Sequence, residues 1–170
     1  GSSLGSGTAY TPRMTISPIT GELYIYYTDS GLSYQGVVKK FDGTSWVDVG
    51  ATLFDDTFYN RGIDIAIHPV TGEPYAVYDN PATRRAIVVR YDATSTLWTT
   101  VGASDITFPY PYSRIAFNPF TYEPYIGYVD ASNGEKATVI RYSTTSAAWV
   151  TVGSAGFTAD NVSLLSKMSF

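Results

Sequence analysis

Three stretches of the sequence end in the same way, and their spacing decides the fold: TSWVDVG (residues 44–50), TLWTTVG (96–102) and AAWVTVG (147–153). Each stretch has a Trp four residues before a Gly, and the stretches recur at intervals of 52 and 51 residues. A period of this size is typical of repeat architectures, in which every repeat is one supersecondary unit. We therefore predict that the chain consists of three copies of one structural unit.

Each unit contains three further apolar runs before its Trp run. The first runs are RMTISP (13–18), DIAIHP (64–69) and RIAFNP (114–119), and the second runs are LYIYYTD (23–29), PYAVYD (74–79) and PYIGYVD (124–130). The third runs are GVVKKFD (36–42), AIVVRYD (86–92) and ATVIRYS (137–143). Short apolar runs separated by Gly, Pro, Asp and Ser are typical of strands joined by tight turns. Four strands in a repeat of about 50 residues predict one blade of a β-propeller, with the first run innermost and the Trp run outermost.

The composition agrees with this all-β fold class. The chain has 15 Tyr, eight Phe and three Trp, which suit half-buried pleated surfaces, and 15 Gly and nine Pro, which interrupt long helices. The net charge is −4 and the basic residues are scattered, so we expect no nucleic acid partner. No apolar run approaches the length of about 18 residues that a membrane span needs, so we expect no membrane insertion.

The sequence resembles the kelch-like and sialidase-like β-propellers, in particular bacterial repeat proteins with blade units of the type GTSWxxVG. The resemblance covers nearly everything from Arg13 onward, and FDGTSWVDVG (41–50) is its closest part. It implies the propeller fold but no single activity, because members of this group have many functions. In such a fold we expect each Trp to pack between adjacent blades and each Gly to let the chain leave the outer strand.

We divide the chain into an N-terminal extension or tag remnant (1–12) and three blades with their connectors (13–62, 63–113 and 114–165). The last segment, SKMSF (166–170), copies SRIAF (113–117) and predicts the inner strand of a fourth repeat. The expected fold is a half-propeller that is completed by oligomerisation.

Three blades are too few for a closed ring, because propellers typically contain four to eight. An open flank that leaves on the order of 500 Å² of apolar surface in water forgoes roughly 12 kcal/mol. This rivals the whole stability of a domain, about 5–15 kcal/mol. We predict a homodimer that closes a six-bladed ring by exchanging the C-terminal strand. The alternative is that the 170 residues are part of a longer repeat protein.

Signals for catalysis are weak in this sequence. The only His, His68, lies just before Pro69 at a position occupied by Ser17 and Asn118 in the other units, which favours a role in a turn. The motif GSSLG (1–5) matches the nucleophile pattern GxSxG but lacks the strand and helix around it. We expect no enzyme activity, no catalytic residue, no cofactor and no metal. The oxygen-rich stretches TDSGLS (28–33) and DASNGE (130–135) leave calcium as an alternative to tight turns.

The candidate binding residues belong to the propeller face that carries the connectors and the loops between second and third strands. Exposed aromatic side chains beside Asp suit carbohydrate or protein ligands, and two arginines at the channel mouth suit a carboxylate. The alternatives are turn capping for the Asp residues, gap filling for the aromatic residues and mutual pairing for the charges. The predicted set is Asp29, Asp79, Asp130, Tyr59, Phe108, Tyr110, Tyr112, Arg13 and Arg114.

The recurrent Glu22, Glu73 and Glu123 are interpreted as architectural, because one active site needs groups that differ between blades. The leading functional hypothesis is a non-catalytic propeller module that assembles with itself and acts as an interaction or structural scaffold. The alternative is a lectin-like propeller with repeated carbohydrate sites at the blade junctions, and the third hypothesis is a fragment of a glycosidase-type propeller. An extracellular or cell-surface location is favoured.

Overall fold

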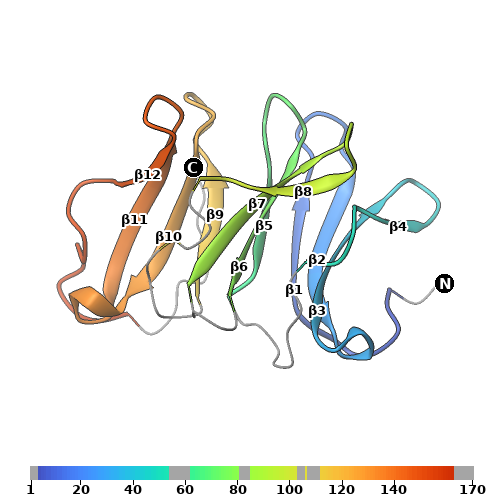
Figure 1. Cartoon of the computed structure of the whole chain (residues 1–170), viewed down its shortest axis with the longest axis horizontal. Helices are drawn as coiled ribbons and strands as arrows, with labels where there is room; N and C mark the ends of the chain where they lie inside the picture. Colours follow the sequence, from blue (N-terminus) through green and yellow to red (C-terminus); the bar gives the residue numbers. More distant parts are fainter. Residues whose placement is uncertain (1–3, 54–61, 81–84, 103–105, 107–111, 163–170) are drawn as a thin grey trace.

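The computed structural model of the chain contains three four-stranded antiparallel sheets that stand side by side (Figure 1). It describes residues 4–53, 62–80, 85–102, 106 and 112–162. Within these ranges there is no α-helix, and no helix is long and apolar enough to cross a membrane. The all-β fold class predicted from the sequence is confirmed.

Strands follow one another across each sheet in chain order, as in the blades of a propeller. Sheet 1 consists of β1 (Ala9–Ile16), β2 (Leu23–Asp29), β3 (Gln35–Phe41) and β4 (Trp46–Asp48). Sheet 2 consists of β5 (Asp64–Ile67), β6 (Pro74–Asp79), β7 (Ala86–Asp92) and β8 (Leu97–Thr100). Sheet 3 consists of β9 (Arg114–Phe117), β10 (Pro124–Asp130), β11 (Lys136–Ser143) and β12 (Ala148–Thr151). Two 3₁₀ turns, η1 (Ser30–Leu32) and η2 (Ala131–Asn133), follow the second strands of sheets 1 and 3.

The turn between the first and second strands is built by one side chain that accepts two backbone N–H groups. Ser17, His68 and Asn118 fill this position in turn. Side chains of this kind stabilise turns because they replace the missing backbone partners. His68 is therefore a turn residue, as its position in the repeat predicts.

Two apolar clusters lie between the sheets and join them. One contains Tyr24, Tyr26 and Val38 of sheet 1 against Ile65 and Ile67 of sheet 2, and its residues are almost fully buried. The other joins sheet 2 to sheet 3 in the same way. Because strands alternate their side chains, each sheet presents one apolar face to each neighbour. Sheet 2 is the middle sheet and is packed on both faces.

The repeated Trp and Gly residues meet across these junctions. The Trp98 indole nitrogen of sheet 2 donates to the Val49 carbonyl oxygen of sheet 1 at 3.0 Å, and a Cβ added at Gly50 would lie 2.8 Å from that nitrogen. Trp149 binds the Val101 carbonyl oxygen at 3.0 Å and packs against Gly102 in the same way. The Trp of one sheet thus rests on the Gly of the preceding sheet, which confirms that the Trp packs between sheets.

Candidate functional site

Both junctions between neighbouring sheets open into a pocket, and the two pockets are equivalent. The first junction pocket lies between sheets 1 and 2 and has a volume of about 270 Å³. The second junction pocket lies between sheets 2 and 3 and is larger, at about 840 Å³. Each is lined by the third strand of one sheet and by the turn before the second strand of the next. These turns lie at the top of Figure 1, opposite η1 and η2.

Strand register brings the same kinds of side chain into both pockets. Tyr24 lies opposite Lys40 in sheet 1, and Tyr75 lies opposite Arg90 in sheet 2. Directly opposed residues project on the same side of an antiparallel pair, so each tyrosine and cation share one pocket. The following sheet adds a Glu and a second Tyr. The equivalent sets are Tyr24, Lys40, Glu73 and Tyr91 in the first pocket and Tyr75, Arg90, Glu123 and Tyr142 in the second.

Each sheet pairs its own cation with its own Glu at these positions. The pairs are Lys40–Glu22 at 2.8 Å, Arg90–Glu73 at 3.8 Å and Arg141–Glu123 at 2.6 Å. The hydrogen bond from Lys40 holds the pKa of Glu22 below its usual value, and the same bond raises the pKa of Lys40. Both groups are therefore charged at neutral pH. Arg90 makes the longest of the three pairs, which leaves its planar guanidinium with N–H donors for a ligand.

The phenols of Tyr24 and Tyr75 form the inner walls of the two pockets. Burial raises the pKa of both hydroxyls above the ordinary value. Each phenol is protonated at physiological pH, and it brings an aromatic face and a hydroxyl group to its pocket. Tyr75 packs edge to face on Phe117 with ring centroids 4.9 Å apart, which fixes its ring in the second pocket.

His68 also belongs to the wall of the second pocket. Its Nδ1 accepts the N–H groups of Val70 at 3.2 Å and Thr71 at 3.1 Å, and its ring packs on Phe117 with centroids 5.0 Å apart. Burial lowers the pKa of the imidazole. The turn requires a neutral imidazole whose Nδ1 accepts hydrogen bonds. His68 therefore forms part of the pocket wall, and its Nδ1 is already bonded within the protein.

Tyr122 gives the second pocket a feature that the first one lacks. It adopts a left-handed backbone conformation with φ of 60°, where the equivalent residues of the other sheets are Gly21 and Gly72. This conformation disfavours any residue with a Cβ. Tyr122 lines the second pocket and its ring centroid lies 6.4 Å from that of His68. A bulky side chain therefore occupies a glycine position beside the pocket, at the strained kind of site that is often functional.

The three aspartates predicted as binding residues are buried at the opposite ends of the second strands. Asp29, Asp79 and Asp130 have relative exposures of 0%, 7% and 4%. Asp29 caps η1 by accepting Gly31 N–H, and Asp130 caps η2 by accepting Ser132 N–H. These two carboxylates thus take the capping role that the sequence offered as the alternative.

The two arginines predicted at the channel mouth lie around one depression together with Asp64. Arg13, Asp64 and Arg114 line a central depression of about 480 Å³ between the inner strands β1, β5 and β9. Burial and then the Arg13 charge lower the pKa of Arg114, whose guanidinium donates to the Ser113 carbonyl oxygen at 2.8 Å. Asp64 accepts the Ile115 N–H at 3.0 Å. These hydrogen bonds of Arg114 and Asp64 are thus made to backbone groups of the protein itself.

Three of the four predicted aromatic binding residues lie outside the part of the chain that the structure describes. Tyr59, Phe108 and Tyr110 lie outside the described residues, as does the predicted C-terminal strand 166–170. Tyr112 is half-buried just before β9. Within the described ranges, no group of three or more Asp, Glu or His side chains is placed to hold a metal ion.

The residues of the junction pockets were missed by the sequence analysis, although their signal was present. Glu22, Glu73 and Glu123, and the cations before Phe41, Tyr91 and Tyr142, recur in every unit. Recurrence was interpreted as architecture alone. What indicates a site is that the cation of one sheet and the Glu of the next sheet line the same pocket. This can be recognised only when the packing of the sheets is known.

Comparison with known proteins gives a likeness of fold. No protein-family model and no curated protein sequence matches the chain. Among solved structures it is similar to AofleA from Arthrobotrys oligospora, with a TM-score of 0.60 and 13% sequence identity. The match covers 87% of this chain and 44% of AofleA, so the chain spans less than half the length of that protein.

Proposed function

We propose that the chain is a non-catalytic part of a β-propeller and that it binds carbohydrate in its junction pockets. The observation that carries this proposal is the repetition of one constellation, a Tyr, a cation, a Glu and a second Tyr, at both junctions. Repeated sites on one rigid scaffold suit a lectin-like module, because several sites together raise avidity for a multivalent ligand.

The chemistry of the pockets matches that of a sugar. Sugars present several hydroxyl groups and one less polar ring face, so they bind best where charged hydrogen-bonding groups lie beside an aromatic surface. Arg90 and Glu123 supply a cationic donor and an anionic acceptor in the second pocket, and Tyr75 and Tyr142 supply aromatic surface. Hydrogen bonds to charged groups are roughly twice as strong as those between neutral groups, which gives these two residues the largest expected effects.

The second junction pocket is the stronger candidate of the two. It is about 840 Å³ in volume, within the range of ligand sites, whereas the first is about 270 Å³. Tyr122 adds an aromatic side chain there at the cost of an unfavourable backbone conformation. Glu123 is the one carboxyl group among its described lining residues. Glycoside hydrolysis usually needs a pair of carboxyl groups, so this composition supports binding over catalysis.

A glycan array followed by calorimetric titration of the best sugar tests the proposal. We expect Arg90→Gln to weaken binding about tenfold or more, because a charge-assisted bond is lost. Arg13→Gln removes the same charge at the axis and is the matched control, which should bind like the wild type. An array with no bound sugar, or loss of binding in Arg13→Gln alone, would overturn the assignment to the junction pockets.

A further inference from the structure

The outer end of sheet 3 exposes side chains whose equivalents are buried in sheets 1 and 2. Val49 and Val101 have relative exposures of 5% and 8%, whereas the equivalent Val152 has 38%. Each connector then returns to bond the start of the third strand, through Leu53, Ile106 and Phe157. Leu53 and Ile106 are 4% and 7% exposed, but Phe157 is 57% exposed.

The glycine at this end of sheet 3 is also uncovered, unlike its equivalents in sheets 1 and 2. Gly50 and Gly102 are covered by the Trp of the next sheet, while a Cβ added at Gly153 would meet no atom within 4 Å. Sheet 3 thus carries the receiving half of a junction. This half, which we call the sheet 3 flank, consists of Val152, Gly153 and Phe157.

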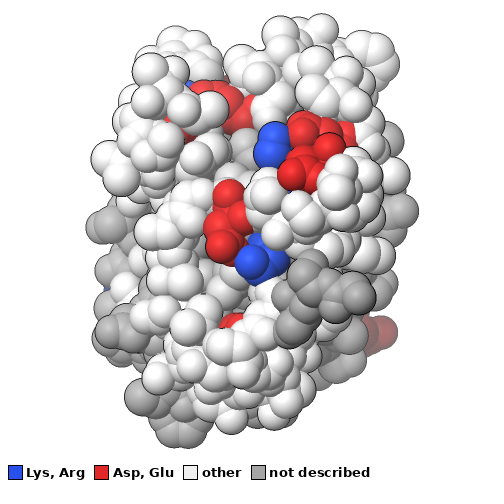
Figure 2. All heavy atoms as spheres, turned by 90° about the vertical axis from the view of Figure 1, so that its right-hand side faces the viewer, with Lys and Arg blue, Asp and Glu red and all other residues white. Residues whose placement is uncertain are grey.

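Sheet 1 carries the complementary half on its outer face. Met14 and Ile16 of β1 are 66% and 63% exposed, whereas their equivalents in β5, Ile65 and Ile67, are 4% and 6% exposed against sheet 1. Trp46 packs against Phe41 in a tilted arrangement with ring centroids 5.5 Å apart, as Trp98 does against Tyr91. Figure 2 looks onto this side of the molecule, where charged side chains gather in a few places and most of the surface is uncharged.

Within the part of the chain that the structure describes, Trp46 does not make the bond that the other two Trp residues make. Trp98 and Trp149 each donate to a carbonyl oxygen of the preceding sheet. Among the described residues, Trp46 has no such acceptor, since no described sheet precedes sheet 1. We call Met14, Ile16 and Trp46 the sheet 1 flank; the neighbouring Val37 is already buried beside Leu4 and Trp46.

We propose that the sheet 3 flank of one copy binds the sheet 1 flank of a second copy, in the geometry of the internal junctions. Trp46 of the second copy then covers Gly153 and donates to the Val152 carbonyl oxygen. Two copies satisfy all four flanks at once, because each contributes one flank of each kind. The result is a closed ring of six sheets with twofold symmetry, the commonest symmetry of soluble oligomers.

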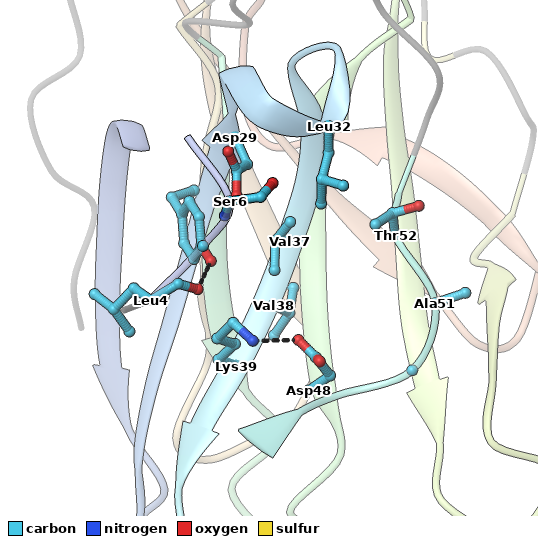
Figure 3. Close-up of a pocket in the computed structure, with 13 residues that line it drawn as sticks. Leu4, Ser6, Asp29, Leu32, Val37, Val38, Lys39, Asp48, Ala51 and Thr52 are labelled. Carbon is cyan, nitrogen blue, oxygen red and sulfur yellow. Dashed lines mark hydrogen bonds and ion pairs between the residues drawn. The ribbon is translucent and has the colours of Figure 1, made fainter. Parts of the chain in front are cut away.

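A pocket on the outer side of sheet 1 provides a place for Phe157 of the other copy. It has a volume of about 590 Å³ and is lined by Leu4, Tyr27, Val37 and Lys39 among others (Figure 3). The Tyr27 hydroxyl donates to the Leu4 carbonyl oxygen, which holds the N-terminal segment against the sheet. Phe is larger than the Leu and Ile that fill the internal junctions, and the proposal places its larger ring in this pocket.

Lys39 places a charged side chain at a position that is apolar in the other two sheets. Its equivalents Val89 and Ile140 are buried at 5% each. Lys39 forms a 2.6 Å ion pair with Asp48, which Figure 3 shows beside Val38. The pair neutralises the charge locally, so docking need not bury an uncompensated cation. Two junctions of this kind bury on the order of 2,000 Å² in total, which suffices for a stable dimer.

Docking completes a further junction pocket, and this step rests on the proposed function. Tyr125 and Arg141 of sheet 3 are the equivalents of Tyr75 and Arg90, and they lie opposite each other in the sheet. Glu22 and Phe41 of the second copy take the places of Glu123 and Tyr142. The dimer then has a carbohydrate site at every junction, including one shared site at each contact between copies.

Sedimentation velocity of the 170-residue chain over a range of concentrations tests the dimer. One copy has a mass of 18.5 kDa, so we expect a single species of about 37 kDa, twice that value. Phe157→Asp places a charge in the contact and should give a monomer with an unchanged circular dichroism spectrum. Leu97→Asp is the matched control, because Leu97 is 58% exposed on the middle sheet, and it should remain dimeric.

The outcomes separate the two proposals. A monomeric wild type, a mass that grows beyond two copies, or a Phe157→Asp dimer of wild-type strength overturns the docking of flanks. In the dimer, titration with the array sugar should show that Arg141→Gln removes one-third of the sites. A dimer that binds no sugar overturns the proposed function but leaves the docking intact, and unchanged stoichiometry in Arg141→Gln overturns the shared site.

Discussion

The closed junctions and the open flanks of this protein are made from the same repeated residues, yet these residues have opposite environments. Val101, Gly102 and Ile106 are covered by sheet 3, whereas no described sheet covers Val152, Gly153 and Phe157 on the outer side of sheet 3. The difference shows that the repeat specifies half of a junction on each face of a sheet. Burial is then decided by the neighbour, because a sheet face gains stability only when another face covers it.

The largest expected effect distinguishes a junction Trp from a flank Trp. Trp98→Ala removes an indole that packs on Gly50 and bonds the Val49 carbonyl oxygen, so we expect a loss of about 3 kcal/mol in the free energy of unfolding. Trp46→Ala should cost about 1–2 kcal/mol in the Phe157→Asp background, where Trp46 has only its own sheet as a neighbour. Urea denaturation of the variants measures both values, and equal losses would contradict the distinction.

The glycines allow the same comparison at a smaller scale. A Cβ at Gly102 would lie 2.9 Å from Tyr142 and 3.0 Å from Trp149, whereas Gly153 has open space around it. Both have positive φ, 75° and 69°, so Ala is strained at either position. We expect Gly102→Ala to cost about 2–3 kcal/mol and Gly153→Ala about 1 kcal/mol in the same monomeric background. Thermal unfolding monitored by circular dichroism compares them, and the reverse order would mean that Trp149 does not rest on Gly102.

Tyr122 is a residue of the second junction pocket whose equivalent in the first pocket is a glycine. Tyr122→Gly restores the residue type found at Gly21 and Gly72, where the backbone also has positive φ. We expect the free energy of unfolding to rise by about 1 kcal/mol, because the left-handed conformation no longer opposes a side chain. Sugar affinity should fall in the same variant. Greater stability with unchanged affinity would show that Tyr122 plays no part in the site.

The smallest effect is a pH dependence that belongs to the second junction alone. His68 has a folded pKa below its usual 6.5 because of burial, so the unfolded chain takes up a proton first as the pH falls. Stability from this group is fully present well above pH 6.5 and declines as the pH falls below it, and the decline is small because water screens the partly exposed ring. His68→Asn copies Asn118 and keeps the acceptor. The variant should lose this decline between about pH 7 and 5, and an identical decline would assign it to other groups.

The fold was predictable because every unit repeats its local signals. The Trp and Gly spacing, the Pro after each first strand and the turn acceptors Ser17, His68 and Asn118 are all local patterns, and the structure confirms the strands that they predict. The capping role of Asp29 and Asp130 was also within reach, since Asp before a tight turn commonly accepts its N–H groups.

The candidate site was not predictable in the same way. Arg90 and Glu123 belong to different units and are separated by a connector, so only the packing of sheet 3 on sheet 2 brings them to one pocket. The binding residues predicted from the sequence lie on the face with the connectors, whereas the junction pockets lie at the short turns on the opposite face. The recurrent cations and Glu residues therefore have a structural role in each sheet and also line the candidate site where two sheets pack together.

The central claim is that the junctions between sheets, which hold the fold together, are also where the protein binds its ligand. A crystal structure of the chain with the best sugar from the glycan array tests this most directly. We predict electron density for the sugar in the second junction pocket, between Arg90 and Glu123 and against Tyr142. Sugar bound instead at the axis beside Arg13, or at the buried ends near Asp29 and Asp130, would contradict the account.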